Sequence, residues 1–181
     1  MQEKRKSGRR SAGKIIIVLF LILVCTGVYY QLFYHPQQVN SGIAVPGKTF
    51  VHANEVWAAK FIPNSENIAS GSVDSTVQLW NKEDGHLLRT LKHPAGVTNL
   101  SISKNGALIV TSSYDGLLRI WRIADGALLH ILRGHEGTVW SVCFSPDDNF
   151  IASCGEDKTV RLWNVNDGTL IRTLKGHSMN I

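Results

Sequence analysis

The sequence predicts an all-β fold of three four-stranded antiparallel sheets, preceded by a single N-terminal transmembrane helix. Three observations lead to this prediction. A unit of about 41 residues occurs three times, each unit contains four short β-rich runs, and one uncharged apolar segment precedes the units. The 181 residues provide room for one ordinary domain or slightly more, and the hydrophobic content of 44% gives no sign of disorder.

The net charge of +5 is concentrated at the N-terminus. Residues 1–14 form a basic tail with six Lys or Arg and one Glu, whereas the remainder has 13 basic and 13 acidic residues. A neutral body lacks the basic surface that neutralises phosphates, so we expect no nucleic-acid binding by the folded part.

Residues 15–34 are twenty consecutive residues without a charge. As a helix they would reach about 30 Å, which matches the hydrocarbon core of a bilayer. Three tyrosines near the C-terminal end of the segment (Tyr29, Tyr30 and Tyr34) are typical of the membrane interface. Because the basic tail flanks the other end, the positive-inside rule places the N-terminus in the cytoplasm and the repeats on the extracytoplasmic side. We therefore expect a single-pass membrane protein.

Two other interpretations of residues 15–34 stay open. The small residues at 25–27 follow an apolar run, as in a cleaved signal peptide, and cleavage would leave the repeats secreted or periplasmic. A buried core helix is less favoured, because such strong charge asymmetry is rare inside a soluble fold. Residues 35–47 contain two prolines and two glycines among mostly polar residues, which indicates a linker.

The repeats occupy about 52–92, 93–133 and 134–175, and the first residues of a fourth follow at 176–181. Histidines 52, 93, 135 and 177 are separated by 41, 42 and 42 residues. The short turns within each unit allow only antiparallel pairing, so each unit is expected to form a four-stranded meander. One such sheet cannot bury both of its faces, so the units must stack on one another.

The spacing, the Gly134-His135 and Gly176-His177 pairs and the recurring Ser/Thr, Asp and Trp positions resemble the WD-repeat β-propeller family. The resemblance covers residues 48–181 and implies a partial propeller of three blades. The name-giving dipeptide is absent, since Asn81, Arg122 and Asn164 follow the three tryptophans, and the first two histidines lack the preceding glycine. Such variation is common in the family.

The resemblance also implies a buried hydrogen-bonded network of His, Ser or Thr, Asp and Trp in each blade. The His to Ser/Thr spacing is 18 residues and the Ser/Thr to Asp spacing is four in every unit. A buried carboxylate needs hydrogen-bond donors, which the histidine and the turn amides can supply. The expected network residues are His52, Ser70, Asp74 and Trp80, then His93, Thr111, Asp115 and Trp121, then His135, Ser153, Asp157 and Trp163.

These residue types are also those of a catalytic triad, but the pattern favours structure. No Gly-x-Ser-x-Gly motif surrounds the serines, Thr111 replaces Ser in one unit, and catalysis rarely needs three copies of a site. An enzyme on this scaffold would need titratable residues on the innermost strands, which offer only Lys60. No CxxC, HExxH or Gly-rich phosphate loop occurs, so we expect no enzyme activity, no metal and no cofactor.

The resemblance to the WD-repeat family also implies where partners bind. In that family they bind mainly at one face of the ring, through residues that start the innermost strand or precede the network Asp. The aromatic members of this set are of the kind that dominates binding energy. An alternative is that Trp57 and Trp140 fill space between blades. The positions that match are Glu55, Trp57, Val73, Gly96, Thr98, Tyr114, Thr138, Trp140 and Glu156.

The two cysteines of the third unit lie in neighbouring predicted strands. If these strands pair around the turn at 145–149, Cys143 lies opposite Ala152 and Cys154 lies opposite Ser141. The two thiols are then not opposite each other, so we expect two small buried thiols and no disulfide.

The functional interpretation is a non-catalytic, membrane-anchored scaffold for protein–protein interaction. Three blades leave an open arc whose end sheets expose apolar faces. We therefore favour a fragment or truncated form of a longer propeller, with self-association of several arcs as the alternative. A docking or sensory region of a larger signalling protein, such as a bacterial kinase, and an exported propeller after signal cleavage also stay open.

Overall fold

The computed structural model describes residues 49–179. Within them lie twelve β-strands, and no helix is long and apolar enough to cross a membrane. The predictions for the basic tail (1–14), the membrane segment (15–34) and the linker (35–47) concern residues outside this range.

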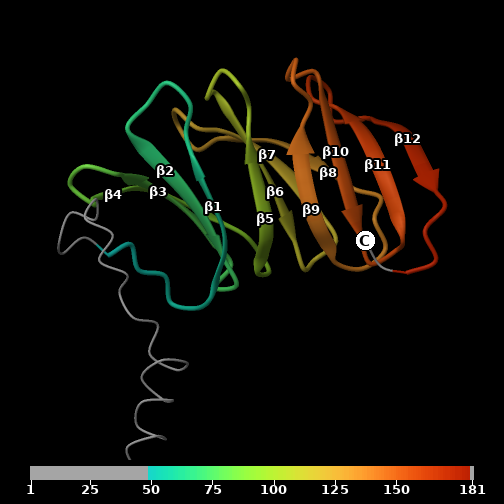
Figure 1. Ribbon diagram of the computed structural model, residues 1–181, viewed down its shortest axis with the longest axis horizontal. Coiled ribbons are helices and arrows are strands. Elements are labelled where there is room, and N and C mark those ends of the chain that lie inside the picture. Colours follow the sequence, from blue (N-terminus) through green and yellow to red (C-terminus); the bar gives the residue numbers. More distant parts are fainter. Residues whose placement is uncertain (1–48, 180–181) are drawn as a thin grey trace, which may run out of the picture. The chain divides into compact units, whose positions relative to one another are not determined.

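The twelve strands form three four-stranded antiparallel sheets, as the repeat pattern predicts (Figure 1). Each sheet is one blade, and its strands pair in the order of the sequence. The first blade contains β1 (Val56–Phe61), β2 (Asn67–Ser72), β3 (Thr76–Asn81) and β4 (Leu87–Lys92). The second contains β5 (Val97–Ile102), β6 (Leu108–Ser113), β7 (Leu118–Arg122) and β8 (Leu128–Leu132). The third contains β9 (Val139–Phe144), β10 (Phe150–Gly155), β11 (Thr159–Asn164) and β12 (Leu170–Lys175).

The apolar core lies between blades. We call the face of a blade that points to the following blade its trailing face, and the opposite face its leading face. One buried cluster joins the trailing face of the first blade to the leading face of the second, and a second cluster repeats this between the second and third blades. The first includes Val77, Leu79, Leu91, Val97, Leu100 and Trp121, and the second includes Val110, Leu118, Leu132, Val139, Val142 and Trp163.

Tight turns bring the blades into close contact. Gly126 lies in the turn between β7 and β8 with φ of +73°. This backbone conformation is energetically unfavourable for residues with a side chain, and glycine adopts it readily. A Cβ atom at this position would also lie 2.6 Å from Cδ of Arg89 in the first blade. Glycine therefore satisfies both the turn and the contact between the blades.

The register of the third blade confirms the predicted cysteine pairing. Cys143 pairs with Ala152 and Cys154 pairs with Ser141, and both thiols are free. The prediction that both are buried is wrong: Cys143 is exposed and Cys154 is partly exposed. The reason is their position on the trailing face of the third blade, which is not covered by another blade within residues 49–179.

Candidate functional site

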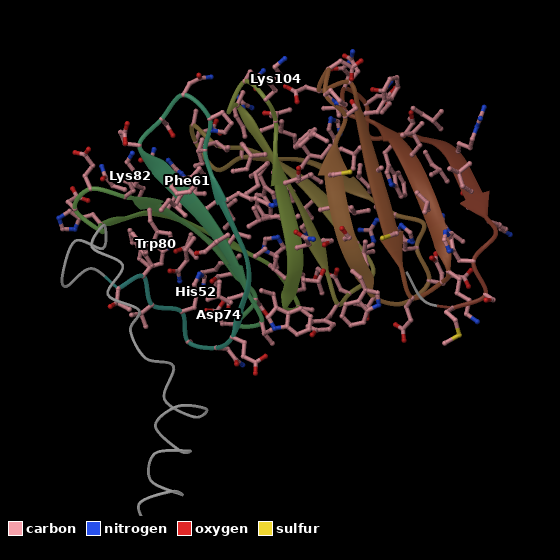
Figure 2. All side chains as sticks on the ribbon, in the orientation of Figure 1. His52, Phe61, Asp74, Trp80, Lys82 and Lys104 are labelled. Atoms are coloured by element: carbon pink, nitrogen blue, oxygen red, sulfur yellow. The ribbon has the colours of Figure 1, made fainter. Side chains whose placement is uncertain are left out.

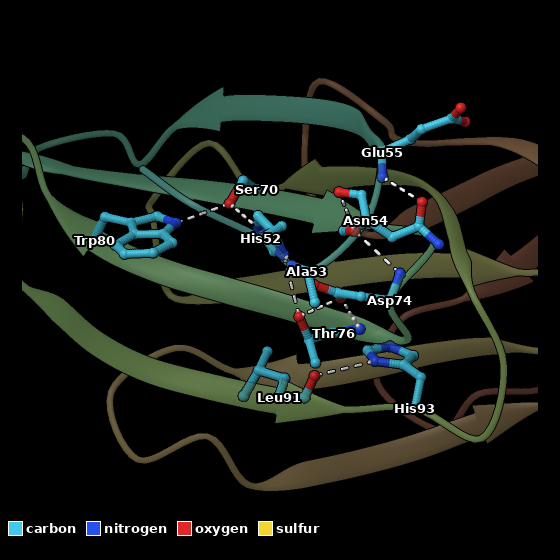
Figure 3. Close-up of polar contacts among 11 residues, drawn as sticks. His52, Ala53, Asn54, Glu55, Ser70, Asp74, Thr76, Trp80, Leu91 and His93 are labelled. Atoms are coloured by element: carbon cyan, nitrogen blue, oxygen red, sulfur yellow. Dashed lines mark hydrogen bonds and ion pairs between the residues drawn. The ribbon is translucent and has the colours of Figure 1, made fainter. Parts of the chain in front are cut away.

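The network of the first blade is a chain of hydrogen bonds from Trp80 to Asp74 (Figure 3). The indole Nε1 of Trp80 donates to Oγ of Ser70 at 2.8 Å. Oγ of Ser70 lies 2.7 Å from Nε2 of His52, whose Nδ1 lies 2.9 Å from the Asp74 carboxylate. Because the carboxylate only accepts, Nδ1 donates to it and Nε2 accepts the serine proton.

The order Ser70–His52–Asp74 is that of a catalytic triad, but the surroundings of the serine differ. Ser70 is 5% exposed, and its oxygen already accepts the proton of Trp80 Nε1. A serine nucleophile must reach a substrate carbonyl beside donors for the oxyanion. Ser70 instead lies inside the blade, where its hydroxyl joins β2 to β3 and to the segment before β1.

Asp74 closes the turn between β2 and β3. Its carboxylate accepts from the amide and the hydroxyl of Thr76 at 2.9 and 2.6 Å, and from the amide of Ala53 at 3.0 Å. Burial would raise the pKa of this carboxyl, but the hydrogen bonds from Thr76, His52 and Ala53 outweigh burial and hold the pKa below its usual value. The ionised carboxylate therefore fixes the turn and the chain entering β1 together.

The third blade repeats this arrangement. Nδ1 and Nε2 of His135 lie 2.9 and 2.8 Å from Asp157 and Ser153, and Trp163 donates to Ser153 at 2.8 Å. Burial opposes ionisation of Asp157, but the hydroxyl and amide of Thr159 and other donors lower its pKa to about 2. The His135 pKa is lowered by burial, although Asp157 acts in the opposite direction.

The second blade departs from the expected network at Asp115. Trp121 and His93 both bond Thr111, at 3.3 and 2.9 Å, but Nδ1 of His93 donates to the carbonyl oxygen of Leu91 at 3.2 Å. Asp115 is bound instead by both terminal nitrogens of Arg119, at 3.2 and 2.7 Å. The expectation of a His93–Asp115 contact is therefore wrong.

The cause lies two residues after the aspartate. The first and third blades have Thr76 and Thr159 there, and each hydroxyl donates to Oδ1 of its aspartate. The second blade has Leu117, whose side chain brings no donor, and Oδ1 of Asp115 accepts from the Leu117 amide and from Arg119 instead. A bidentate pair between arginine and a carboxylate is stronger than a single hydrogen bond from a neutral histidine, so Arg119, 4% exposed, outcompetes His93.

Because Asp115 pairs with Arg119 and not with His93, the His93 imidazole is neutral. Burial first, and the nearby charge of Arg119 second, lower the pKa of His93 to about 4. The geometry agrees, because an imidazole that donates from Nδ1 to a carbonyl and accepts at Nε2 from Thr111 carries one proton.

A β-bulge in the innermost strand of each blade aims one residue toward the edge that bears these turns. The pairing with the second strand skips a residue at Trp57 in β1, at Thr98 in β5 and at Trp140 in β9. A bulged residue is not held in the alternation of the strand, so its side chain can point along the sheet edge. We call this edge, formed by residues 52–57, 73–75, 93–98, 114–116, 135–140 and 156–158, the rim.

Three aromatic rings from three blades meet at the rim. Trp57 and Trp140 stack at 6.2 Å between ring centroids and 20° between planes, and Tyr114 packs edge-on against both at 5.7 and 5.8 Å. Gly96 makes room for the tyrosine, since a Cβ there would lie 2.9 Å from its Cδ2. Trp57 remains 45% exposed, so the cluster both joins the blades and offers an aromatic surface.

The other predicted rim residues divide into two groups. The carboxylate of Glu55 accepts from Trp57 Nε1 at 3.2 Å, and that of Glu156 accepts from the amide of Thr138 at 3.0 Å, so both glutamates lie beside the exposed surface. Val73 is half-buried. Thr98 is 4% exposed and donates its hydroxyl to the carbonyl oxygen of Val139, so its assignment as an exposed partner-binding residue is wrong.

Four contributors to this site went unrecognised in the sequence: Thr76, Thr159, Arg119 and Arg161, which donates to Asp157 at 3.3 Å. Their signal was present, because the position two residues after each network aspartate reads Thr, Leu and Thr, and the fourth position reads Gln, Arg and Arg. Among the residues that the structure describes, no group of three or more His, Cys, Asp or Glu could hold a metal ion.

The sequence model of the WD domain, G-beta repeat family matches residues 45–81, 85–122 and 126–164. The chain belongs to the WD-repeat family. The fold is also that of solved WD40 propellers: the structure of U3-55K and the crystal structure of RRP9 WD40 repeats each superpose with a TM-score of 0.69 over 72% of this chain, at 23% and 24% identity. The chain covers 42% and 41% of those two chains.

Curated relatives are other WD-repeat proteins that differ in role. A coronin-like protein of Saccharomyces cerevisiae is 39% identical over 42% of this chain and 12% of its own length. The WD repeat-containing protein VIP3 of Arabidopsis thaliana is 32% identical over 58% of this chain and 34% of its own length. The meiotic recombination protein rec14 of Schizosaccharomyces pombe is 31% identical over 60% and 36%. The chain thus spans about a third or less of these relatives.

Replacing Thr159 by Val tests the threonine hydroxyl that the networks of the first and third blades have and that of the second blade lacks. The substitution keeps the shape and removes the hydrogen bond to the buried Asp157 carboxylate. We expect the free energy of unfolding to fall by about 1–2 kcal/mol, measured by urea denaturation. Thr169→Val is the matched control, because its hydroxyl donates to Asp167 at an exposed turn and should matter less. Equal effects of the two substitutions would contradict the assignment.

The neutral His93 predicts a pH-dependent stability. The histidine takes a proton near pH 6.5 in the unfolded chain but only near pH 4 in the folded one. The contribution of neutral His93 to the free energy of unfolding is therefore fully present above pH 6.5 and is lost as the pH falls from 6.5 toward 4. We expect a loss of about 3 kcal/mol in this window, which His93→Gln removes and which urea titrations at several pH values measure. The exposed His86→Gln is the control, and an unchanged slope in His93→Gln would refute the prediction.

Proposed function

We propose that this WD-repeat protein is a non-catalytic scaffold that binds other proteins through the rim. The observation that carries the proposal is the aromatic cluster of Trp57, Tyr114 and Trp140. It gathers one ring from each blade, and Trp57 keeps 45% of its surface exposed. Tryptophan and tyrosine at a sheltered site are the residue types that most often dominate binding energy.

The charges around the cluster select the kind of partner. The exposed charged residues of the rim are three glutamates, Glu55, Glu136 and Glu156, against Lys158. An arginine in the partner can stack on an exposed indole while its guanidinium reaches a carboxylate. We propose a partner segment that presents arginine next to an apolar residue. The same carboxylates disfavour nucleic acid as a ligand.

A peptide-display library selected on the protein tests this proposal. We expect enriched sequences to contain arginine, and their affinity to fall at least about tenfold in Trp57→Ala, because a central aromatic anchor contributes about 2 kcal/mol or more. Leu88→Ala is the matched control, since Leu88 is 49% exposed on the outer strand β4. Circular dichroism verifies that both variants fold. Enrichment of acidic peptides, or equal binding by the two variants, would reject the rim as the binding surface.

We also propose that residues 15–34 tether the scaffold to a membrane, with the N-terminus in the cytoplasm and the blades on the other side. The support is the uncharged stretch of twenty residues next to six basic residues in 1–14. A tether would hold the blades at a membrane and restrict their partners to proteins at that surface.

Alkaline extraction of membranes checks the tether. A spanning helix resists carbonate, so the chain should stay in the pellet. A variant with Leu19→Arg and Leu23→Arg should appear in the supernatant, because each arginine at the centre of a spanning helix costs about 2.5–3.5 kcal/mol. Release of the unaltered chain by carbonate, or a shortened mature N-terminus, would contradict a retained anchor.

A further inference from the structure

The aromatic cluster at the rim carries two unoccupied hydrogen-bond donors. The indole Nε1 of Trp140 and the hydroxyl of Tyr114 make no hydrogen bond within residues 49–179. In that range, Oε1 of Gln78 is the only buried side-chain polar atom without a partner. The donors of the half-buried Trp140 and Tyr114 therefore reach the surface. A ligand that covers the rings must supply acceptors for both, because a buried donor without an acceptor is unfavourable.

The backbone amides at the tips of the blades are already paired. In every blade the residue before the network aspartate donates its amide to a carbonyl oxygen of the segment that enters the innermost strand. These bonds join Val73 to Glu55 at 3.0 Å, Tyr114 to Gly96 at 3.0 Å and Glu156 to Thr138 at 2.8 Å. A partner strand can be added to a sheet only where a row of amides and carbonyl groups is unpaired. Strand addition at the rim is therefore disfavoured.

The two side-chain donors also disfavour a helical ligand. An α-helix uses the carbonyl groups of all but its last turn for its own hydrogen bonds, so its sides present no backbone acceptors. A polyproline II helix has no internal hydrogen bonds, and its carbonyl groups are free to accept. Segments of this kind bind to surfaces lined by aromatic rings, and their conformation is formed before binding. The rings and the donors together match a polyproline II segment.

The size of the cluster agrees with this geometry. The three ring centroids are separated by 5.7, 5.8 and 6.2 Å. Two residues of a polyproline II helix rise by about 6 Å, so one short run of prolines covers the cluster. Because this helix has three residues per turn, the next side chain on the same face comes three residues along the segment.

Two glutamate carboxylates are held at the rim. Oε2 of Glu55 accepts from Nε1 of Trp57, and Oε2 of Glu156 accepts from the amide of Thr138. Gly137 leaves room for Glu156, since a Cβ atom at Gly137 would lie 2.8 Å from Oε2. Within the part of the chain that the structure describes, Oε1 of each glutamate makes no hydrogen bond. Each carboxylate can therefore accept from a guanidinium.

We infer that the segment bound at the rim is a polyproline II helix with an arginine three residues from a proline on the same face. This inference rests on the proposed function, because it specifies the segment that the rim binds. The prolines pack on the aromatic cluster, and carbonyl groups of the segment accept from Tyr114 and Trp140. The arginine pairs with Glu55 or with Glu156, according to the direction in which the segment runs.

Three synthetic peptides test the conformation of the segment. The first, acetyl-Arg-Pro-Leu-Pro-Pro-Leu-Pro-Arg-amide, places an arginine three residues from a proline at both ends, so that it serves either direction of binding. The second has alanine in place of every proline, and the third has glutamate in place of both arginines. Fluorescence anisotropy measures the binding of each labelled peptide to the full chain in detergent. We expect the second and third peptides to bind at least about tenfold more weakly than the first, because one lacks the preformed conformation and the other repels the carboxylates.

Tyr114→Phe tests the donors. The substitution keeps the ring and removes the hydroxyl, so the first peptide should bind roughly two- to tenfold more weakly, as for the loss of one hydrogen bond. Thr169→Val is the matched control, because it removes a hydroxyl from the turn between β11 and β12. That turn lies at the edge of the blades that bears Lys104, opposite the edge that bears Asp74 and the rim (Figure 2). The affinity of Thr169→Val for the peptide should equal that of the unaltered chain.

Equal binding of the proline and alanine peptides would overturn the inference. An unchanged affinity in Tyr114→Phe, or no binding of the proline peptide, would overturn it as well. A peptide-display selection that enriches arginine without proline would do the same, but it would leave the rim as the binding surface. If Trp57→Ala also bound every selected peptide as the unaltered chain does, the proposed function would be rejected together with this inference.

Discussion

A four-stranded sheet of five- and six-residue strands has two faces and cannot cover either by itself, and this constraint governs the structure. The buried apolar side chains of this protein lie between blades rather than within them. The innermost strand of the second blade packs against the innermost strands of both neighbours. Stability is therefore a property of adjacent pairs of blades, and each blade supplies half of two interfaces.

The second organising feature is the aspartate at the turn between the second and third strands of each blade. It is ionised, accepts several hydrogen bonds, and in the first and third blades joins the turn to the histidine before the innermost strand. Asp115 performs the same task at its own turn with Arg119 as partner. One position thus tolerates two sets of donors, provided that the carboxylate is satisfied.

The repeat pattern was sufficient to predict the strands, their antiparallel order and the register of Cys143 and Cys154, because short turns leave one way to pair adjacent runs. Spacing also located the residues of the hydrogen-bonded networks. It did not predict that Arg119 displaces His93 from Asp115, because that outcome depends on competition between donors. Two residue identities, Leu117 and Arg119, decide it.

Burial was the least predictable property. Thr98 occupies the same bulge as Trp57 and Trp140, but it is small enough to turn inward and donate to Val139. The position of the aromatic cluster over the middle blade follows from this difference in size, together with the space above Gly96. The exposure of Cys143 depends on whether a neighbouring blade covers it, which the local sequence does not encode.

The bulge has a consequence for how such a surface evolves. Its central residue is absent from the register of the sheet, so its side chain can change without altering the pairing of the strands around it. Trp, Thr and Trp already occupy this position in one chain. At Trp57 and Trp140 the side chain can therefore change without altering the pairing of the strands, whereas Thr98 is held in place by its hydrogen bond to Val139.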